Sequence, residues 1–199
     1  MANVFAPTGL VWSRNKLAAS PSYQLQAMKI VNGYATSIPK GSLVVETGGY
    51  ITLWADNGAR ITGVFMGVYP YFDTNAQQTM HGRNGAWIAS TTASGDVDCA
   101  VITDPMAIFR IQCSGIAPAV TWPGLNLNTI AGTNATLSAS GISVLAGDSA
   151  TPAANAAFPF VIEGLAGVVG GPQDPTQTNP TLEVRINPAL HTALLGLGA

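Results

Sequence analysis

The chain has 199 residues, only 9% of them charged, and a formal net charge of −2 at pH 7. Its 8 lysines and arginines are scattered singly, which argues against the clustered basic surface that binding to a nucleic-acid backbone requires. No run of about 18 apolar residues could cross a bilayer, and no basic region precedes an apolar run at the N-terminus. We therefore expect no membrane span, no nucleic-acid partner, no secretory signal and synthesis in the cytoplasm.

The low charge content indicates that much of the surface is shared with other subunits. An average soluble domain has about 25% charged residues, whereas this chain has 9% charged residues and 47% hydrophobic ones. Large apolar patches on a protein surface mark interaction sites. The length suits one domain with a substantial core, so we expect a single domain that forms a homo-oligomer.

Residues 1–22 are predicted to form an extended N-terminal arm. Apolar residues are separated there by Pro7 and Gly9, and no helical period is sustained. Phe5, Leu10 and Trp12 are the candidate contact residues, because three large apolar side chains on an arm need a surface to bury them. That surface is either a partner or neighbouring subunit, or the arm's own subunit.

Residues 23–199 are predicted to form one β domain. Residues 23–31 alternate with a period of two, which predicts a strand with one face in water. Short strands follow at 43–46, 50–54 and 61–69, and residues 70–85 are polar and rich in turn residues, which predicts a long surface loop. This spacing of strands and turns is typical of a β-barrel or β-sandwich, jelly-roll-like, with little helix.

Residues 97–115 contain two β-rich runs joined at Asp104-Pro105, which predicts a hairpin. Alternate residues of the second run, from Ala107 to Cys113, are expected to face the core. In such a hairpin Cys99 and Cys113 would lie opposite each other. A disulfide is one possibility, and we favour two reduced, buried thiols.

The rest of the chain is predicted to be β structure interrupted by loops. Residues 114–135 look irregular, a β pattern rich in small residues resumes at 135–145, and 158–165 and 181–187 form the last strand pair. Residues 170–180 are rich in Gly and Pro, which predicts an exposed, mobile loop. One short helical turn is expected at 189–195.

No pattern of residues indicates catalysis, a metal or a cofactor. His81 and His191 have no ligand-type residues at metal-binding spacing, so we expect a loop side chain and a surface or interface residue. Asp96 and Asp98 are more typical of solvated carboxylates than of a general acid–base pair. Asn134 opens a weak glycosylation sequon. We therefore expect that the protein is not an enzyme and binds no metal or cofactor.

Three stretches together resemble the capsid decoration, or cement, proteins of tailed bacteriophages. They are residues 1–10, residues 100–112 with the Asp104-Pro105 junction, and residues 160–165 leading to 182–187. The resemblance implies a β domain that binds the major capsid protein on the exterior of the expanded capsid, as a dimer or trimer, and stabilises the virion. The alternative is a tail, baseplate or head-tail adaptor protein; an enzyme or a carbohydrate-binding module is less favoured.

Overall fold

The computed structural model describes residues 3–17, 25–56, 59–89, 92–167, 174 and 176–192. All regular secondary structure in these residues is β, so the mainly β prediction is confirmed. The strands are β1 (Val11–Asn15), β2 (Leu25–Ile30), β3 (Leu43–Thr47), β4 (Tyr50–Leu53), β5 (Gly63–Val68), β6 (Tyr71–Asp73), β7 (Gln78–Met80), β8 (Val97–Ile102), β9 (Ala107–Ser114), β10 (Asn126–Thr129), β11 (Gly147–Ala153), β12 (Phe160–Ala166) and β13 (Thr181–Ile186).

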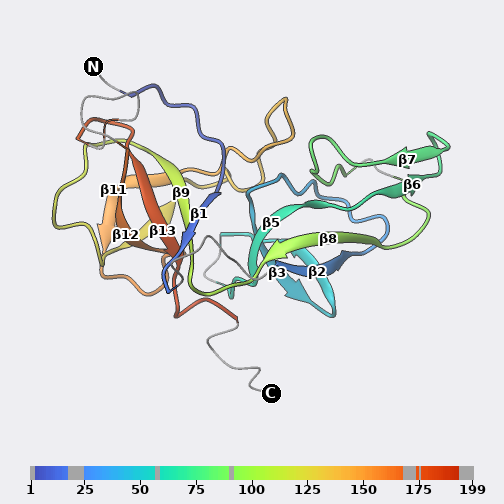
Figure 1. Ribbon diagram of the computed structural model, residues 1–199, viewed down its shortest axis with the longest axis horizontal. Coiled ribbons are helices and arrows are strands. Elements are labelled where there is room, and N and C mark those ends of the chain that lie inside the picture. The colour runs from blue at the N-terminus through green and yellow to red at the C-terminus, as the bar shows by residue number, and fades with distance from the viewer. Residues whose placement is uncertain are drawn as a thin grey trace.

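The strands gather in two lobes that lie side by side (Figure 1). In the first lobe β9 pairs with β13, β13 with β12, β12 with β10, β10 with β11, and β11 returns to β9. This ring of pairings closes a barrel, which we call the barrel lobe, and β1 adds to it by pairing antiparallel with β9. The predicted last strand pair is confirmed, because Phe160 of β12 lies opposite Ile186 of β13.

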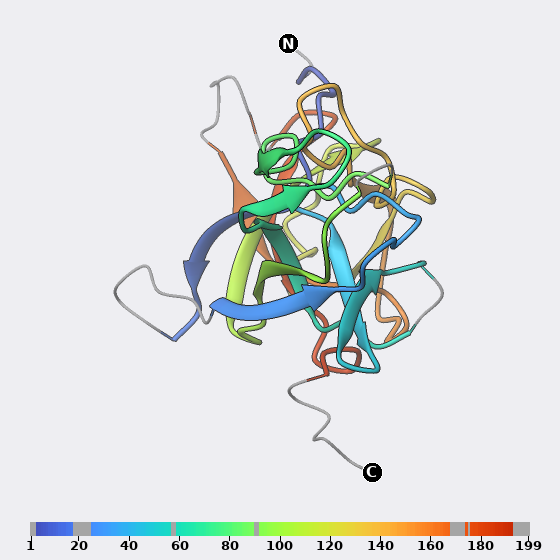
Figure 2. The same cartoon turned by 90° about the vertical axis from the view of Figure 1, so that its right-hand side faces the viewer.

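The second lobe is a sheet with the strand order β2-β8-β5-β3-β4, and we call it the sheet lobe. The sheet curls until its two end strands, β2 and β4, come into contact. The hairpin of β6 and β7 extends from this lobe at one end of the long axis, and Figure 2 views the molecule from that end. The predicted surface loop at 70–85 therefore contains a small hairpin.

The predicted hairpin at 97–115 is wrong. A turn does form at the Asp-Pro junction, where the Ala107 N–H donates to the Asp104 carbonyl over 3.1 Å. The two runs then enter different lobes: β8 pairs with β2 and β5, whereas β9 pairs with β1, β11 and β13. Both strands have neighbours on both edges, so neither has an edge left for the other.

Two hydrophobic clusters fill the molecule. The larger cluster combines the barrel interior, including Phe109 and Phe160, with Leu43, Val64 and Ile102 from the sheet lobe, so the two lobes share one core. The smaller cluster lies within the sheet lobe around Trp87. On β9 the expected alternation is confirmed, since the alternate residues from Ala107 to Cys113 all belong to the larger cluster.

Several local predictions need correction. Residues 135–145 contain only isolated bridges, because their small side chains build a turn-rich segment instead of a strand. In the 170–180 loop Asp174 is buried, since it is bonded to the N-terminal segment; residues 168–173 and 175 lie outside the described residues. The helical turn predicted at 189–195 is not helical in its described part: residues 188–190 form a turn and His191 makes an isolated β-bridge, whereas 193–199 lie outside the described residues.

Candidate contact surface

The start of the N-terminal arm is tied to its own subunit by side-chain hydrogen bonds. Asn3 is buried; its Nδ2 donates to the Asp174 carbonyl over 2.9 Å, and the Asp174 N–H donates to its Oδ1 over 3.1 Å. Gln112 of β9 holds the next residues: its Oε1 accepts the Ala6 N–H and its Nε2 donates to the Val4 carbonyl, each over 2.7 Å. The arm is thus fixed on the barrel lobe, although it has no regular structure before β1.

The second part of the arm crosses to the sheet lobe. Gly9 has a φ of 68°, and a Cβ at this position would lie only 2.8 Å from the Cβ of Ser143. The glycine therefore allows a close approach that other residues would hinder. The Leu10 N–H then donates to the Gly41 carbonyl of the sheet lobe over 3.0 Å. The arm connects the two lobes at this point.

Ion pairs hold β1 across the outer face of the barrel lobe. Arg14 pairs with Glu183 at 2.8 Å, and Glu163 pairs with Lys16 at 2.7 Å and with Arg185 at 2.8 Å. Burial raises the pKa of the Glu183 carboxyl, but hydrogen bonds from Arg14 and Ser13 outweigh burial and leave the pKa below its ordinary value. This charged face stabilises the arm and offers little apolar surface to a partner.

The three predicted contact residues have different environments. Leu10 is 3% exposed and packs in the shared core, which is the alternative of burial within its own subunit. Trp12 is partly buried against the same core. Phe5 is 42% exposed, Val4 just before it is 78% exposed, and Val11 at the start of β1 is 49% exposed. We use the name arm surface for these three exposed apolar residues of the arm, Val4, Phe5 and Val11.

A groove lies next to the arm surface, between β1 and the sheet lobe. It has a volume of ≈ 440 Å³, within the range of about 300–1,000 Å³ typical of binding sites. We call it the arm groove. Its lining is mostly apolar and consists of Thr8, Leu10, Val11, Trp12, Lys40, Gly41, Met66, Asn84 and Ile142.

Further exposed apolar side chains lie outside the arm. The predicted strand at 23–31 is confirmed over residues 25–30, which form β2. Its faces differ from the apolar–polar alternation, because Ile30 lies in the core, whereas Leu25 and, just after the strand, Val31 are exposed at 46% and 37%. Tyr69 and Phe72 are exposed at and beside the β6–β7 hairpin. The described residues thus expose apolar side chains at several separate places on the surface.

His191 is buried, which corrects the prediction of a surface or interface residue. Its backbone pairs with Ile61 of the sheet lobe, so the chain places it inside the junction of the lobes. Burial lowers the pKa of the imidazole to about 4, although Asp104 acts in the opposite direction. The histidine is therefore neutral at pH 7. His81 is exposed, as expected of a loop residue.

The other candidate residues, Asp96, Cys99 and Cys113, make contacts that serve the fold. Asp96 accepts hydrogen bonds from the Asn32 N–H at 3.0 Å and the Tyr50 hydroxyl at 2.9 Å, which lower its pKa. Cys99 and Cys113 are free, buried and in different clusters. Burial raises the pKa of Cys99 to about 12 and that of Cys113 still further, so both thiols are protonated and unreactive at pH 7.

Within the described ranges, no group of three or more His, Cys, Asp or Glu side chains gathers as metal ligands would. The same residues contain no helix of the length and apolarity that spanning a membrane takes. Comparison with protein-family models, with curated proteins and with solved structures finds no match. The surface itself is the basis for a functional proposal.

Sequence reasoning missed Asn3 and Gln112, which hold the arm, and Met66 and Ile142, which line the groove. These residues come from separate segments of the chain, and no local motif marks them. The positions visible in the sequence were Phe5, Leu10 and Trp12, as large apolar residues, and Gly9, as a break in the apolar pattern of the arm.

Proposed function

We propose that this protein is a structural virion component that binds the outer surface of an expanded tailed-bacteriophage capsid as a small homo-oligomer and stabilises it. The observation that carries the proposal is the arm surface. Phe5 is 42% exposed although the backbone around it is held in place: the Gln112 side chain bonds to Val4 and Ala6, and the Asn179 amide donates to the Asn3 carbonyl. Exposed apolar side chains on an ordered backbone lose little conformational freedom on binding, which favours an interface.

The expected mechanism is stabilisation by differential binding. A protein that binds the expanded shell and not its separated subunits raises the free energy needed to disassemble the shell. Several apolar contacts on one oligomer act together, so that modest individual contacts produce strong attachment. The scarcity of charge, 9% of residues, suits a protein that is buried between others.

Cosedimentation with purified shells tests the proposal. We expect saturable binding to expanded, undecorated capsids and none to unexpanded ones. The variant Phe5→Ser should fold normally and bind at least tenfold more weakly, whereas Val120→Ser, at a position 89% exposed in the barrel lobe, is the matched control. Absence of binding to both shells would contradict the proposal and favour a tail, baseplate or head-tail adaptor.

A further inference from the structure

The β6–β7 hairpin is a rigid projection that carries an exposed aromatic side chain. Asp73 Oδ1 accepts the N–H groups of Asn75 and Ala76 at 2.9 and 2.8 Å and the Thr92 hydroxyl at 3.0 Å, which fixes the turn. The hairpin is also bonded to the following segment, since the Ser94 N–H donates to the Phe72 carbonyl over 3.0 Å. The hairpin is therefore ordered before any partner arrives.

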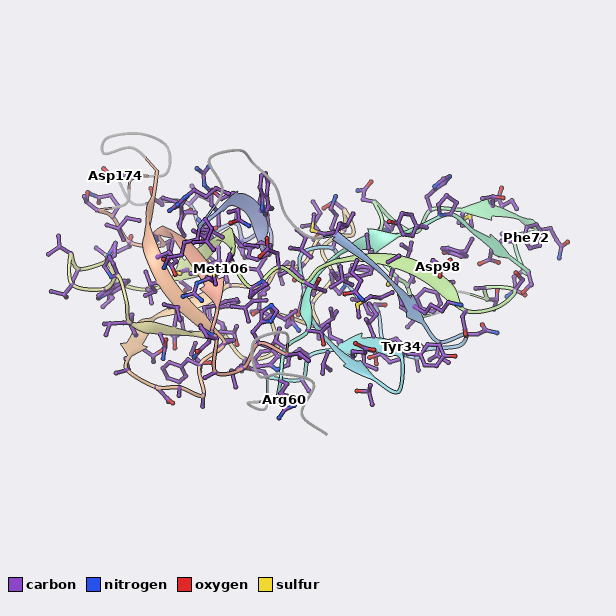
Figure 3. All side chains as sticks on the ribbon, turned by 60° about the horizontal axis from the view of Figure 1, so that its bottom comes forward. Tyr34, Arg60, Phe72, Asp98, Met106 and Asp174 are labelled. Carbon is purple, nitrogen blue, oxygen red and sulfur yellow. The ribbon has the colours of Figure 1, made fainter. Side chains whose placement is uncertain are left out.

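Phe72 points away from the body of the sheet lobe. Its neighbour Tyr71 packs against Trp87, with ring centroids 6.2 Å apart, and successive side chains of a strand face opposite sides. Phe72 is accordingly 43% exposed, and Tyr69 just before the hairpin is 42% exposed. Figure 3 shows Phe72 at the far end of the molecule from Asp174. Aromatic side chains in such positions are frequent anchors of protein interfaces.

The arm groove is equally well fixed. Its walls are tied together by the Leu10–Gly41 hydrogen bond, by the Ser143 N–H donating to the Lys40 carbonyl over 2.8 Å, and by the Asn84 amide donating to the Ser140 carbonyl. Its floor and walls include Leu10, Trp12, Met66 and Ile142. The groove thus offers a preformed apolar site large enough for an aromatic ring.

The charges around the two features are complementary. Lys40 lines the groove and Arg83 lies against its Ser140–Ile142 wall; neither has an ion-pair partner in the described part of the chain. Asp73 lies on the hairpin itself, and Asp96 and Asp98 lie at the start of β8, where Lys29 of β2 is opposite Asp98. Asp98 is labelled at the same end as Phe72 in Figure 3. The end of the molecule that carries the hairpin is thus acidic and aromatic, whereas the groove is basic and apolar.

We propose that the β6–β7 hairpin of one copy inserts Phe72 into the arm groove of a second copy, so that the chain assembles head to tail. One molecule cannot make this contact with itself, because the β6–β7 hairpin projects to the end of the long axis, away from β1 at the groove (Figure 1). A head-to-tail contact uses two different surfaces and produces a closed ring when its rotation closes. This proposal deepens the oligomer part of the proposed function.

The test uses purified protein without capsids, so its result is independent of capsid binding. Sedimentation velocity should show a closed oligomer for the unaltered chain. Phe72→Ser removes the projection and Val11→Glu places a carboxylate at the exposed rim of the groove, and each should weaken association by about 30-fold or more. Val120→Ser is the control and should assemble normally. High salt should also weaken assembly, because the opposing charges are exposed.

Mixing the two variants gives the sharpest result. Phe72→Ser retains a working groove and Val11→Glu retains a working hairpin, so together they should form a heterodimer that cannot grow further. An interface made of the same patch on both copies would give no such rescue. Three results would each overturn the proposal. The first is that the unaltered chain stays monomeric even at 100-fold the concentration used for the variants. The others are that both variants assemble normally, or that the mixture contains monomers alone. Far-ultraviolet circular dichroism confirms that each variant is folded.

Discussion

Replacing Asn134 by alanine should destabilise the fold strongly, because this side chain joins three backbone groups inside the molecule. Asn134 is 4% exposed. Its Oδ1 accepts the Leu43 N–H at 2.8 Å, and its Nδ2 donates to the carbonyls of Leu43 at 3.1 Å and Trp54 at 2.8 Å. These contacts hold β3 and the end of β4 to the 130–137 segment, and the buried amide is not accessible as a glycosylation acceptor.

The magnitude follows from the groups left without partners. The Leu43 carbonyl keeps the Trp54 N–H, but the Leu43 N–H and the Trp54 carbonyl lose the bonds described above. Each buried unsatisfied group costs about 1–3 kcal/mol, so Asn134→Ala should lower the free energy of unfolding by about 4 kcal/mol. Asn75→Ala, in the exposed β6–β7 turn, should change it by about 0.5 kcal/mol or less.

Urea denaturation of the two variants and the unaltered chain measures these differences. Asn134→Asp adds a second test, because it keeps an acceptor for the Leu43 N–H but places a carboxylate against two carbonyls. Protonation supplies a donor again, so this variant should regain stability as the pH is lowered. One buried unsatisfied group alone costs at least about 1 kcal/mol. If Asn134→Ala lowers the free energy of unfolding by less than that, the reasoning is refuted.

The remaining predictions compare buried side chains of both hydrophobic clusters and the lobe junction with the exposed Phe5. His191 has a pKa of about 4 when folded and an ordinary value of 6.5 when unfolded, so its contribution is fully present above 6.5 and is lost as the pH falls toward 4. The free energy of unfolding should fall by about 3 kcal/mol over this pH range, as urea denaturation at several pH values can measure. His191→Gln should remove this pH dependence. The same pH profile in the variant and the unaltered chain would exclude the role of His191. Leu10→Ala should cost about 2–5 kcal/mol, whereas Phe5→Ser should leave the melting temperature nearly unchanged; equal effects would contradict the different burial of the two side chains. Native protein should resist alkylation at Cys99 and Cys113 and react at both thiols in denaturant, as mass spectrometry can show; a labelled thiol in the folded protein would contradict their burial.

The positions of many strands could be predicted from local patterns, whereas their neighbours could not. The predicted ranges 43–46 and 181–187 correspond to β3 and β13 because apolar β-branched residues and turns mark a strand locally. The Asp104-Pro105 junction looked like a hairpin because a turn and two apolar runs are its usual pattern. Which lobe each run enters depends on strands far away in the chain. The local sequence does not show which of those strands it will pair with.

The candidate surface was only partly predictable for the same reason. The arm was visible as an extended segment, but its three large apolar residues differ in burial, from 3% for Leu10 to 42% for Phe5. The arm is held at Leu10 by Gly41 and on either side of Phe5 by Gln112, and both partners are distant in sequence. His191 was misplaced because a single polar residue in a short terminal segment gives no sign that the segment closes the lobe junction.

Heating expanded capsids with and without the bound protein tests the central claim most directly. Shells should be purified without decoration, saturated with the protein as checked by sedimentation, and heated while light scattering and release of packaged DNA are followed. The account predicts a higher disruption temperature for the saturated shells and a smaller increase for shells mixed with Phe5→Ser. An unchanged disruption temperature at full occupancy would contradict the stabilising role.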